Sequence, residues 1–216
     1  MLATACTSKA HLPSLRSLLR SARLVNITQP VVMLTNADHQ KMMEDTVKPF
    51  GDVTVKVVPQ DLLRNAHHYI KFFVWTLDAD KVFWVDLDSV IMSNFIRQFA
   101  IDRPHFNGSV FYSVPDNLGC NRGDVRTSAC TGFFVIKPNH NTYHKLVDKM
   151  YTWKHTDTWD QPLLNDYYMK LKALDLLPET YSSFPWNCRC GRYDPADLQI
   201  AHFTHWTINS LNFHTG

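Results

Sequence analysis

Residues 82–92 read VFWVDLDSVIM, with Asp86 and Asp88 following an apolar run. The run from Val82 to Val85 predicts a buried β-strand, and the two carboxylates stand at positions i and i+2 just after it. An acid pair at the end of a buried strand lies where open α/β sheets bind their ligands. An Asp-x-Asp sequence alone is weak evidence for a site, because acids often terminate strands, so its meaning depends on the rest of the chain.

Strand-like and helix-like runs alternate on both sides of this stretch. Short β-rich runs predict strands over residues 2–6, 30–35, 52–58 and 131–136. Apolar residues at helical spacing predict helices after residue 12, over 61–77, after a cap at Asn141, and from Asp160 with Pro162 in the first turn. This alternation predicts an α/β fold, with a mixed, mostly parallel central sheet that carries helices on both faces in a single domain over residues 1–216.

The composition excludes several classes of protein. With 45% hydrophobic and 19% charged residues among 216, the chain can bury a core and is not disordered. A net charge of +2 lacks the one-sided basic surface of a nucleic-acid binder. No apolar run approaches the roughly 18 residues that a membrane span needs. The five Cys form no regular disulfide framework, which favours a reducing, cytoplasmic compartment.

The first 37 residues allow two interpretations. They carry basic residues and Ser but no acid, which resembles a transit peptide. The alternative is a first strand over residues 2–6 followed by an amphipathic helix with Leu15, Leu18 and Leu19 on one side. We favour the second interpretation, because it supplies the opening strand that the remaining pattern requires.

The spacing of Asp86 and Asp88 suits a divalent cation. In an extended strand, residues i and i+2 share a face, so a local turn could aim both carboxylates at one ion. Mn²⁺ and Mg²⁺ prefer oxygen ligands and keep coordination sites open for substrate phosphates. Such an ion would neutralise a diphosphate and stabilise it as a leaving group.

Further blocks, in order along most of the chain, resemble glycosyltransferase family 8, the glycogenin and galactinol synthase group. They are YIKFFVWTL at 69–77, the acid-pair block at 81–94, Pro115-Asp116 with CTGFFVIKP at 130–138, TWDQPLLN at 158–165, and His202-Phe203 with Trp206. The resemblance implies a GT-A fold and a metal-dependent transfer, with retention of anomeric configuration, of a hexose or deoxyhexose from a UDP-sugar. It also implies Mn²⁺ as the metal, with Mg²⁺ as the alternative, and a glycan, glycoprotein or small polyol as acceptor.

The resemblance assigns roles to individual positions. The implied metal ligands are Asp86, Asp88 and His202, and the implied catalytic residues beside the anomeric carbon are Asp160 and Gln161. The implied nucleotide-sugar contacts are Thr4, Ala5, Ser8, Lys71, Asp86, Leu87, Asp88, Thr131, Gly132 and His205. The nucleotide-sugar half would reach to about residue 95, and the acceptor half would cover about 96–216, with Trp153, Trp159 and Trp186 as candidate acceptor platforms.

Each assignment has a plainer alternative. Lys71 could be an exposed helix residue, Asp160 only a helix cap, and residues 4–8 an ordinary strand-to-helix turn. His202 could be one of many ordinary His residues.

The chain also departs from the family pattern. It has Cys130-Thr131-Gly132 where the family usually has Asn-Ser-Gly, and it lacks the family's C-terminal Lys that contacts the diphosphate. His205, Arg189 or Arg192 could substitute for that Lys, or the metal and Lys71 could suffice. The chain could also be one domain of a larger glycan-synthesis protein.

Two other functions remain open from the sequence. The acid pair also resembles the first motif of haloacid-dehalogenase phosphatases, with Asp86 as nucleophile and Asp88 as acid/base. A non-catalytic module that binds UDP or sugar on the same fold is the other alternative, since it would have no need for the missing Lys.

Overall fold

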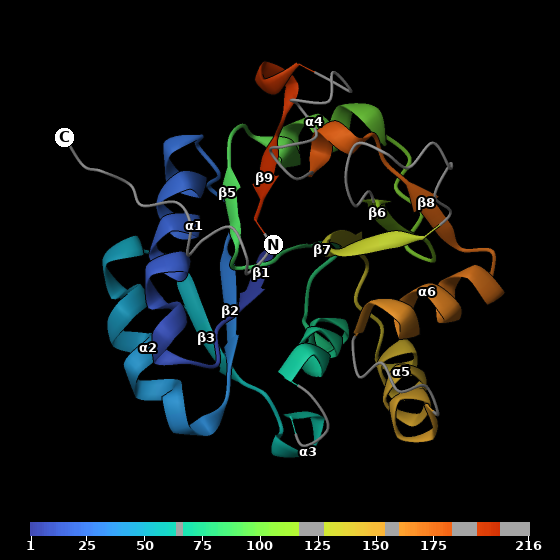
Figure 1. The fold of residues 1–216 in the computed structure, drawn as a ribbon, viewed down its shortest axis with the longest axis horizontal. Coiled ribbons are helices and arrows are strands. Elements are labelled where there is room, and N and C mark those ends of the chain that lie inside the picture. The colour runs from blue at the N-terminus through green and yellow to red at the C-terminus, as the bar shows by residue number, and fades with distance from the viewer. Residues whose placement is uncertain (64–66, 117–127, 154–159, 183–193, 204–216) are drawn as a thin grey trace.

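A seven-stranded sheet in the order β3-β2-β1-β4-β7-β6-β8 runs through the molecule (Figure 1). The structure is a computed structural model that describes residues 1–63, 67–116, 128–153, 160–182 and 194–203. The strands of the sheet are β1 (Leu2–Ala5), β2 (Val31–Thr35), β3 (Val53–Val57), β4 (Val82–Val85), β6 (Phe111–Pro115), β7 (Ala129–Ile136) and β8 (Leu174–Leu176). A separate two-stranded ribbon pairs β5 (Ser89–Ile91) with β9 (Ile200–His202) in antiparallel orientation.

The sheet is mixed but mostly parallel. Strands β3, β2, β1 and β4 are parallel to one another, and β6 is parallel to β8. Strand β7 is antiparallel to β4 and to β6. The carboxyl ends of β1, β2 and β4 therefore lie at the same edge, and β7 begins there.

Helices cover both faces of the sheet (Figure 1). The α-helices are α1 (Leu12–Leu24), α2 (Gln40–Val47), α3 (Gln60–Leu63), α4 (Phe95–Asp102), α5 (His140–Thr152) and α6 (Asp160–Lys170). The 3₁₀ helices are η1 (Lys9–His11), η2 (Ala37–His39), η3 (Lys48–Phe50), η4 (His67–Thr76), η5 (Glu179–Tyr181) and η6 (Pro195–Asp197). One face buries residues of α1, α2 and α4, and the other buries residues of α3, η4, α5 and α6.

Strand β4 shows why the sheet forms from an unbroken apolar run. Phe83 and Val85 face the α1 side, whereas Val82 and Trp84 face the η4 side, and all four are buried. A strand covered on both faces needs apolar residues at every position rather than at alternate ones. The α/β fold with helices on both faces is thereby confirmed.

The interpretation of the N-terminal residues as strand and helix is also confirmed. Residues 2–5 form β1 inside the sheet, between β2 and β4, and Leu15, Leu18 and Leu19 of α1 pack in the core on one face of the sheet. An Arg-rich surface on α1 is simply the solvent side of an amphipathic helix. The transit-peptide interpretation is therefore wrong for this segment.

Two predicted helix boundaries are wrong. The single helix expected over 61–77 is instead α3, which ends at Leu63, and η4, which is a 3₁₀ helix. Ile70, Phe72, Val74 and Trp75 are all buried, so η4 has no single apolar stripe from which its helix type could be inferred. The α5 cap is Asn139, which accepts the N–H of Thr142, and not Asn141, because the extended backbone of Asn139 suits a cap.

Among the helices that the structure describes, none combines the length and the apolar character needed to cross a bilayer. Cys6 and Cys130 are free, buried thiols. The other Cys residues lie outside the described ranges.

Candidate active site

Four segments meet at the carboxyl edge of β4. Asp86 and Asp88 follow β4, and the N–H of Asp86 donates to the carbonyl of Gly132 in β7 at 2.8 Å. His202 ends β9, where it pairs with Ser89 of β5. The N–H of Phe203 donates to the carbonyl of Asp88 at 2.6 Å, which ties the end of β9 to the acid pair.

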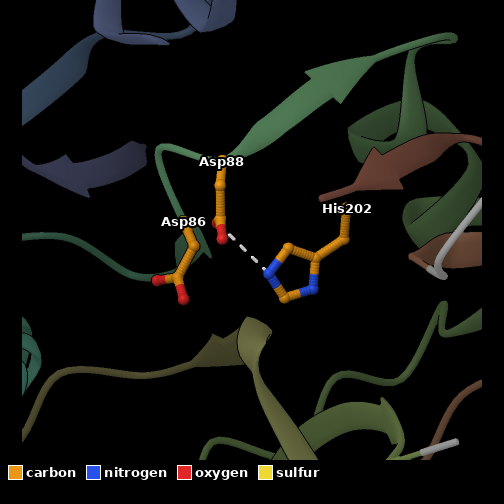
Figure 2. Close-up of side chains that lie close together, drawn as sticks. All are labelled: Asp86, Asp88 and His202. Atoms are coloured by element: carbon orange, nitrogen blue, oxygen red, sulfur yellow. Dashed lines mark ion pairs between the residues drawn. The ribbon is translucent and has the colours of Figure 1, made fainter. Parts of the chain in front are cut away.

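Asp86, Asp88 and His202 lie close enough to bind one metal ion. Each offers a ligand atom, and these atoms lie within 4.8 Å of one another. Asp88 and His202 point toward each other, with 3.2 Å between Oδ1 and Nε2, and Asp86 lies beside them (Figure 2). Two carboxylates with one imidazole are a donor set that suits Mn²⁺ better than Mg²⁺. The predicted ligands are thus brought together from two segments more than a hundred residues apart.

The imidazole of His202 lies against Cys130 and Gly132 as well as Asp88. Its Nδ1 lies 3.9 Å from Sγ of Cys130, and the ring lies directly over Gly132. A Cβ on Gly132 would come within 2.8 Å of both ring nitrogens. Burial alone would lower the pKa of His202, but the hydrogen bond to the Asp88 carboxylate raises that pKa well above its ordinary value.

Substitution of Gly132 by Ala is expected to weaken Mn²⁺ binding about 10–100-fold, the range typical of residues that orient metal ligands. The added methyl group would meet the His202 ring and push Nε2 away from the carboxylates. Isothermal titration calorimetry with Mn²⁺ measures the change. Gly108→Ala is the matched control, because the three atoms nearest to its Cβ would belong to the side chain of Lys137, which is not a predicted metal ligand. Equal dissociation constants for Gly132→Ala and the wild type would contradict this account of His202.

A second cluster adjoins the first through Asp86. Nζ of Lys71 lies 3.0 Å from Oδ2 of Asp86 and 3.2 Å from Oδ2 of Asp160, and it donates to the carbonyl of Thr131 at 3.1 Å. Lys71 and Asp160 are both buried. Burial would lower the pKa of Lys71, but the Asp160 and Asp86 carboxylates raise it above its ordinary value, so the ammonium is charged at neutral pH. The alternative that Lys71 is an exposed helix residue is wrong.

Asp160 and Gln161 begin α6 beside the start of β7. Gln161 Oε1 accepts the N–H of Thr131 at 3.0 Å, and Gln161 Nε2 donates to Asp116 at 3.0 Å. The Gln161 amide therefore connects α6, β7 and the end of β6. The ammonium of Lys71 bridges Asp160 and Asp86. The catalytic roles of Asp160 and Gln161 stay predictions.

Some of the remaining predicted nucleotide-sugar contacts lie within the described residues, and others lie outside them. Thr4 and Ala5 end β1 next to β4, and the buried Thr4 hydroxyl has no hydrogen-bond partner among the described residues. Ser8 caps η1 by accepting the N–H of Ala10, and Leu87 packs against the core on the α1 side. Predictions that lie outside the described residues are those for His205, Arg189, Arg192, Trp159 and Trp186.

Sequence reasoning missed a residue that contacts the acid pair directly. The indole N–H of Trp84 donates to Oδ1 of Asp86 at 2.6 Å. Trp84 precedes Asp86 by two positions, so strand alternation alone places both side chains on one face. Trp153, a candidate acceptor platform, lies near Lys149, whose Nζ is 4.9 Å from its ring centroid.

Comparisons with known proteins bear on the family and the fold of the chain. The family model described as nucleotide-diphospho-sugar transferase matches residues 71–189, just over half of the chain. Glycogenin-1 of Caenorhabditis elegans is 30% identical over 146 residues, which are 62% of this chain and 30% of that protein. The chain thus aligns with less than a third of that curated relative's length.

Solved glycosyltransferase structures share the fold. The glycosyltransferase GlyE of Streptococcus pneumoniae TIGR4 superimposes with a TM-score of 0.67 at 14% identity, over 94% of this chain and 54% of that one. The galactosyltransferase LgtC, in complex with donor and acceptor sugar analogues, gives a TM-score of 0.65 at 13% identity, over 94% and 86% of the two chains. At this identity the likeness establishes the fold alone.

Proposed function

Because the chain belongs to the nucleotide-diphospho-sugar transferase family, we propose that it is a metal-dependent glycosyltransferase that moves a hexose or deoxyhexose from a UDP-sugar to an acceptor hydroxyl. The observation that carries the proposal is the convergence of Asp86, Asp88 and His202 within 4.8 Å at the carboxyl edge of the parallel strands. This edge is where open α/β sheets bind nucleotides.

The three side chains fit a divalent ion, and we propose Mn²⁺ with Mg²⁺ as the alternative. Both carboxylates keep lone pairs, and Nε2 of His202 faces Asp88. A divalent ion held there would supply positive charge to the diphosphate leaving group. Its identity is testable by comparing the two metals in the binding experiment below.

The protein side chains would bind and orient the donor. Thr4, Ala5 and Ser8 lie at or just after the end of β1, next to β4, where a nucleoside would extend from the metal-bound diphosphate. The Thr4 hydroxyl finds no partner within the part of the chain that the structure describes, which supports a ligand contact at this position. Leu87, Thr131 and Gly132 would complete the contacts, and His205 is proposed from the sequence alone.

Lys71 and Asp160 would act nearer to the sugar. Lys71 places a buried positive charge beside Asp86, where it would stabilise the charge of a departing diphosphate. Asp160, held by Lys71, would orient donor hydroxyls with Gln161 and shield an oxocarbenium-like transition state. We propose retention by a front-face route, in which the departing diphosphate oxygen takes the acceptor proton and the enzyme contributes positioning and charge stabilisation.

Thermal unfolding with UDP and Mn²⁺ tests the donor site. Ligand at 100 times its dissociation constant should stabilise the protein by about 2.7 kcal/mol, which is a rise of roughly 5–11 °C in Tm for a chain of this size. The matched controls are UDP with chelator, Mn²⁺ alone, and UDP with Mg²⁺. No rise with UDP in any metal would contradict the proposed donor site.

The same preparation separates the alternatives. A non-catalytic module would show the UDP-dependent rise but leave every UDP-sugar intact over hours. Because the chain belongs to the transferase family, we interpret Asp86 and Asp88 as residues of a transferase and not of a phosphatase. Where a UDP-sugar is consumed, NMR of the product anomeric proton distinguishes retention from inversion.

The acceptor and the compartment are proposed more broadly. We propose a glycan, a glycoprotein or a small polyol as acceptor, bound by the half of the chain after about residue 95. A screen of these acceptor classes with the identified donor tests this assignment. The buried free thiols of Cys6 and Cys130 support a reducing, cytoplasmic environment, which fractionation of cells that express the protein would test.

A further inference from the structure

Trp84 is fixed in place by its neighbours. Its side chain is 1% exposed and lies parallel to Phe134, with ring centroids 5.8 Å apart and an interplanar angle of 7°. Phe134 in turn stacks on Trp75 at 5.6 Å. This column of buried rings packs against the Trp84 indole in the orientation in which its N–H points at Asp86.

The carboxylate of Asp86 receives two donors from different directions. Trp84 Nε1 donates to Oδ1 at 2.6 Å, and Lys71 Nζ donates to Oδ2 at 3.0 Å. Terminal carboxylate torsions are otherwise broad, so a donor on each oxygen selects one orientation. Each oxygen can accept a further contact, so the orientation is fixed while a lone pair on each oxygen remains for an ion.

The same indole also contacts the Lys71 end of the cluster. Nζ of Lys71 lies 5.8 Å from the Trp84 ring centroid, within the range of a cation–π interaction. One rigid side chain therefore orients Asp86 through its edge and Lys71 through its face.

We propose that Trp84 is a positioning residue, whose indole N–H holds Asp86 in the orientation required for binding the divalent ion. This inference rests on the proposed metal site. The ring packing of Trp84 does not require the N–H, so a Phe at this position would keep an aromatic ring against Phe134 and remove the donor to Asp86, together with part of the ring volume and of the contact with Lys71. Groups that orient metal ligands in this way typically change metal affinity 10–100-fold when removed.

Trp75 offers a matched control. It is also 1% exposed, stacks on the same Phe134, and donates its indole N–H to Tyr168 at 3.0 Å, but it contacts no predicted metal ligand. Trp84→Phe and Trp75→Phe therefore each remove one buried indole donor from the same column. We expect Trp84→Phe to weaken Mn²⁺ binding to the nucleotide-free protein about 10–100-fold, and Trp75→Phe to leave it unchanged, as measured by calorimetry.

A second measurement uses the wild type. The indole N–H signal of Trp84 in a ¹⁵N–¹H spectrum should move during titration of the metal-free protein with a diamagnetic ion that occupies the same site, such as Mg²⁺, whereas the Trp75 signal should stay. The two signals are assigned from their loss in the Phe variants. Where a variant is unstable, labelled Trp analogues provide the assignment. This readout follows the hydrogen bond to Asp86 and does not depend on activity.

The outcomes separate this inference from the proposed function. If the wild type binds no Mn²⁺, the metal site is wrong and the role of Trp84 falls with it. If the wild type binds Mn²⁺ and Trp84→Phe binds it equally well, or both variants lose the same affinity, the role of Trp84 alone is overturned. A Trp84 signal that does not move when the diamagnetic ion binds would overturn it as well.

Discussion

Replacement of Asp88 by Asn is expected to lower kcat/KM for sugar transfer at least about 100-fold without unfolding the protein. The carboxylate would be one of the metal ligands, and the charge stabilisation that a metal supplies is worth several kcal/mol, of which each 1.36 kcal/mol is tenfold in rate. The amide of Asn keeps the shape of Asp but not its charge. The backbone carbonyl of Asp88, which accepts the N–H of Phe203, is untouched by the substitution.

Turnover and Tm, measured on the same samples with and without Mn²⁺, check this expectation. Asp45→Asn is the charge-matched control, because Asp45 is an exposed residue of α2 that pairs with Lys41 away from the site. We expect the control to keep full activity, and the Asp88 variant to stay folded in the absence of metal with a lower Tm, because it loses the ion pair with the buried His202. Full metal-dependent turnover by Asp88→Asn would remove Asp88 from the ligand set.

Replacement of Lys71 by Met is expected to lower the free energy of unfolding by about 3–5 kcal/mol, the cost typical of removing one partner from a buried ion pair. The side chain of Asp160 is only 4% exposed, and loss of the ammonium leaves its charge without this ion pair. For a chain of this size the change corresponds to roughly 6–20 °C in Tm. Differential scanning calorimetry of the metal-free protein measures it.

A second substitution separates charge from packing. Asp160→Asn in the Lys71→Met background removes the stranded charge and should restore part of the lost stability, so the double-mutant cycle should show a clear coupling energy. Lys41→Met is the control, because its ion pair lies on the surface and should leave Tm unchanged. A Lys71→Met protein as stable as the wild type would show that the ammonium is not held between the two acids.

The part of the fold that local patterns could predict is the part that depends on burial. The apolar run before Asp86 predicts a strand whichever neighbours it has, because both faces of a central strand are covered. The opening at Asp160 with Pro162 predicts the start of α6 for an equally local reason. The 3₁₀ form of η4 could not be predicted, because its buried residues lie on more than one side and carry no single period.

The candidate site also has a part that local sequence could predict and a part that depends on the tertiary fold. The acid pair is visible in one stretch of sequence, but the contact of Lys71 with Asp160 joins residues of η4 and α6 that only the tertiary fold brings together. The family resemblance supplied His202 as a ligand, whereas the contact of its ring with Cys130 and Gly132 depends on how β7 lies against β9. The contact of Trp84 with Asp86 could have been predicted, because residues two positions apart on a strand share a face.

The ribbon of β5 and β9 gives the site an order of assembly. Asp86 and Asp88 leave the ribosome more than a hundred residues before His202, which arrives on a three-residue strand paired only with β5 among the described strands. Two-stranded pairs are marginal on their own, so the seven-stranded sheet can be complete before the third ligand is in place. A bound ion would then act as a cross-link between the sheet and the ribbon, and its binding would slow hydrogen exchange in β9 more than in β1.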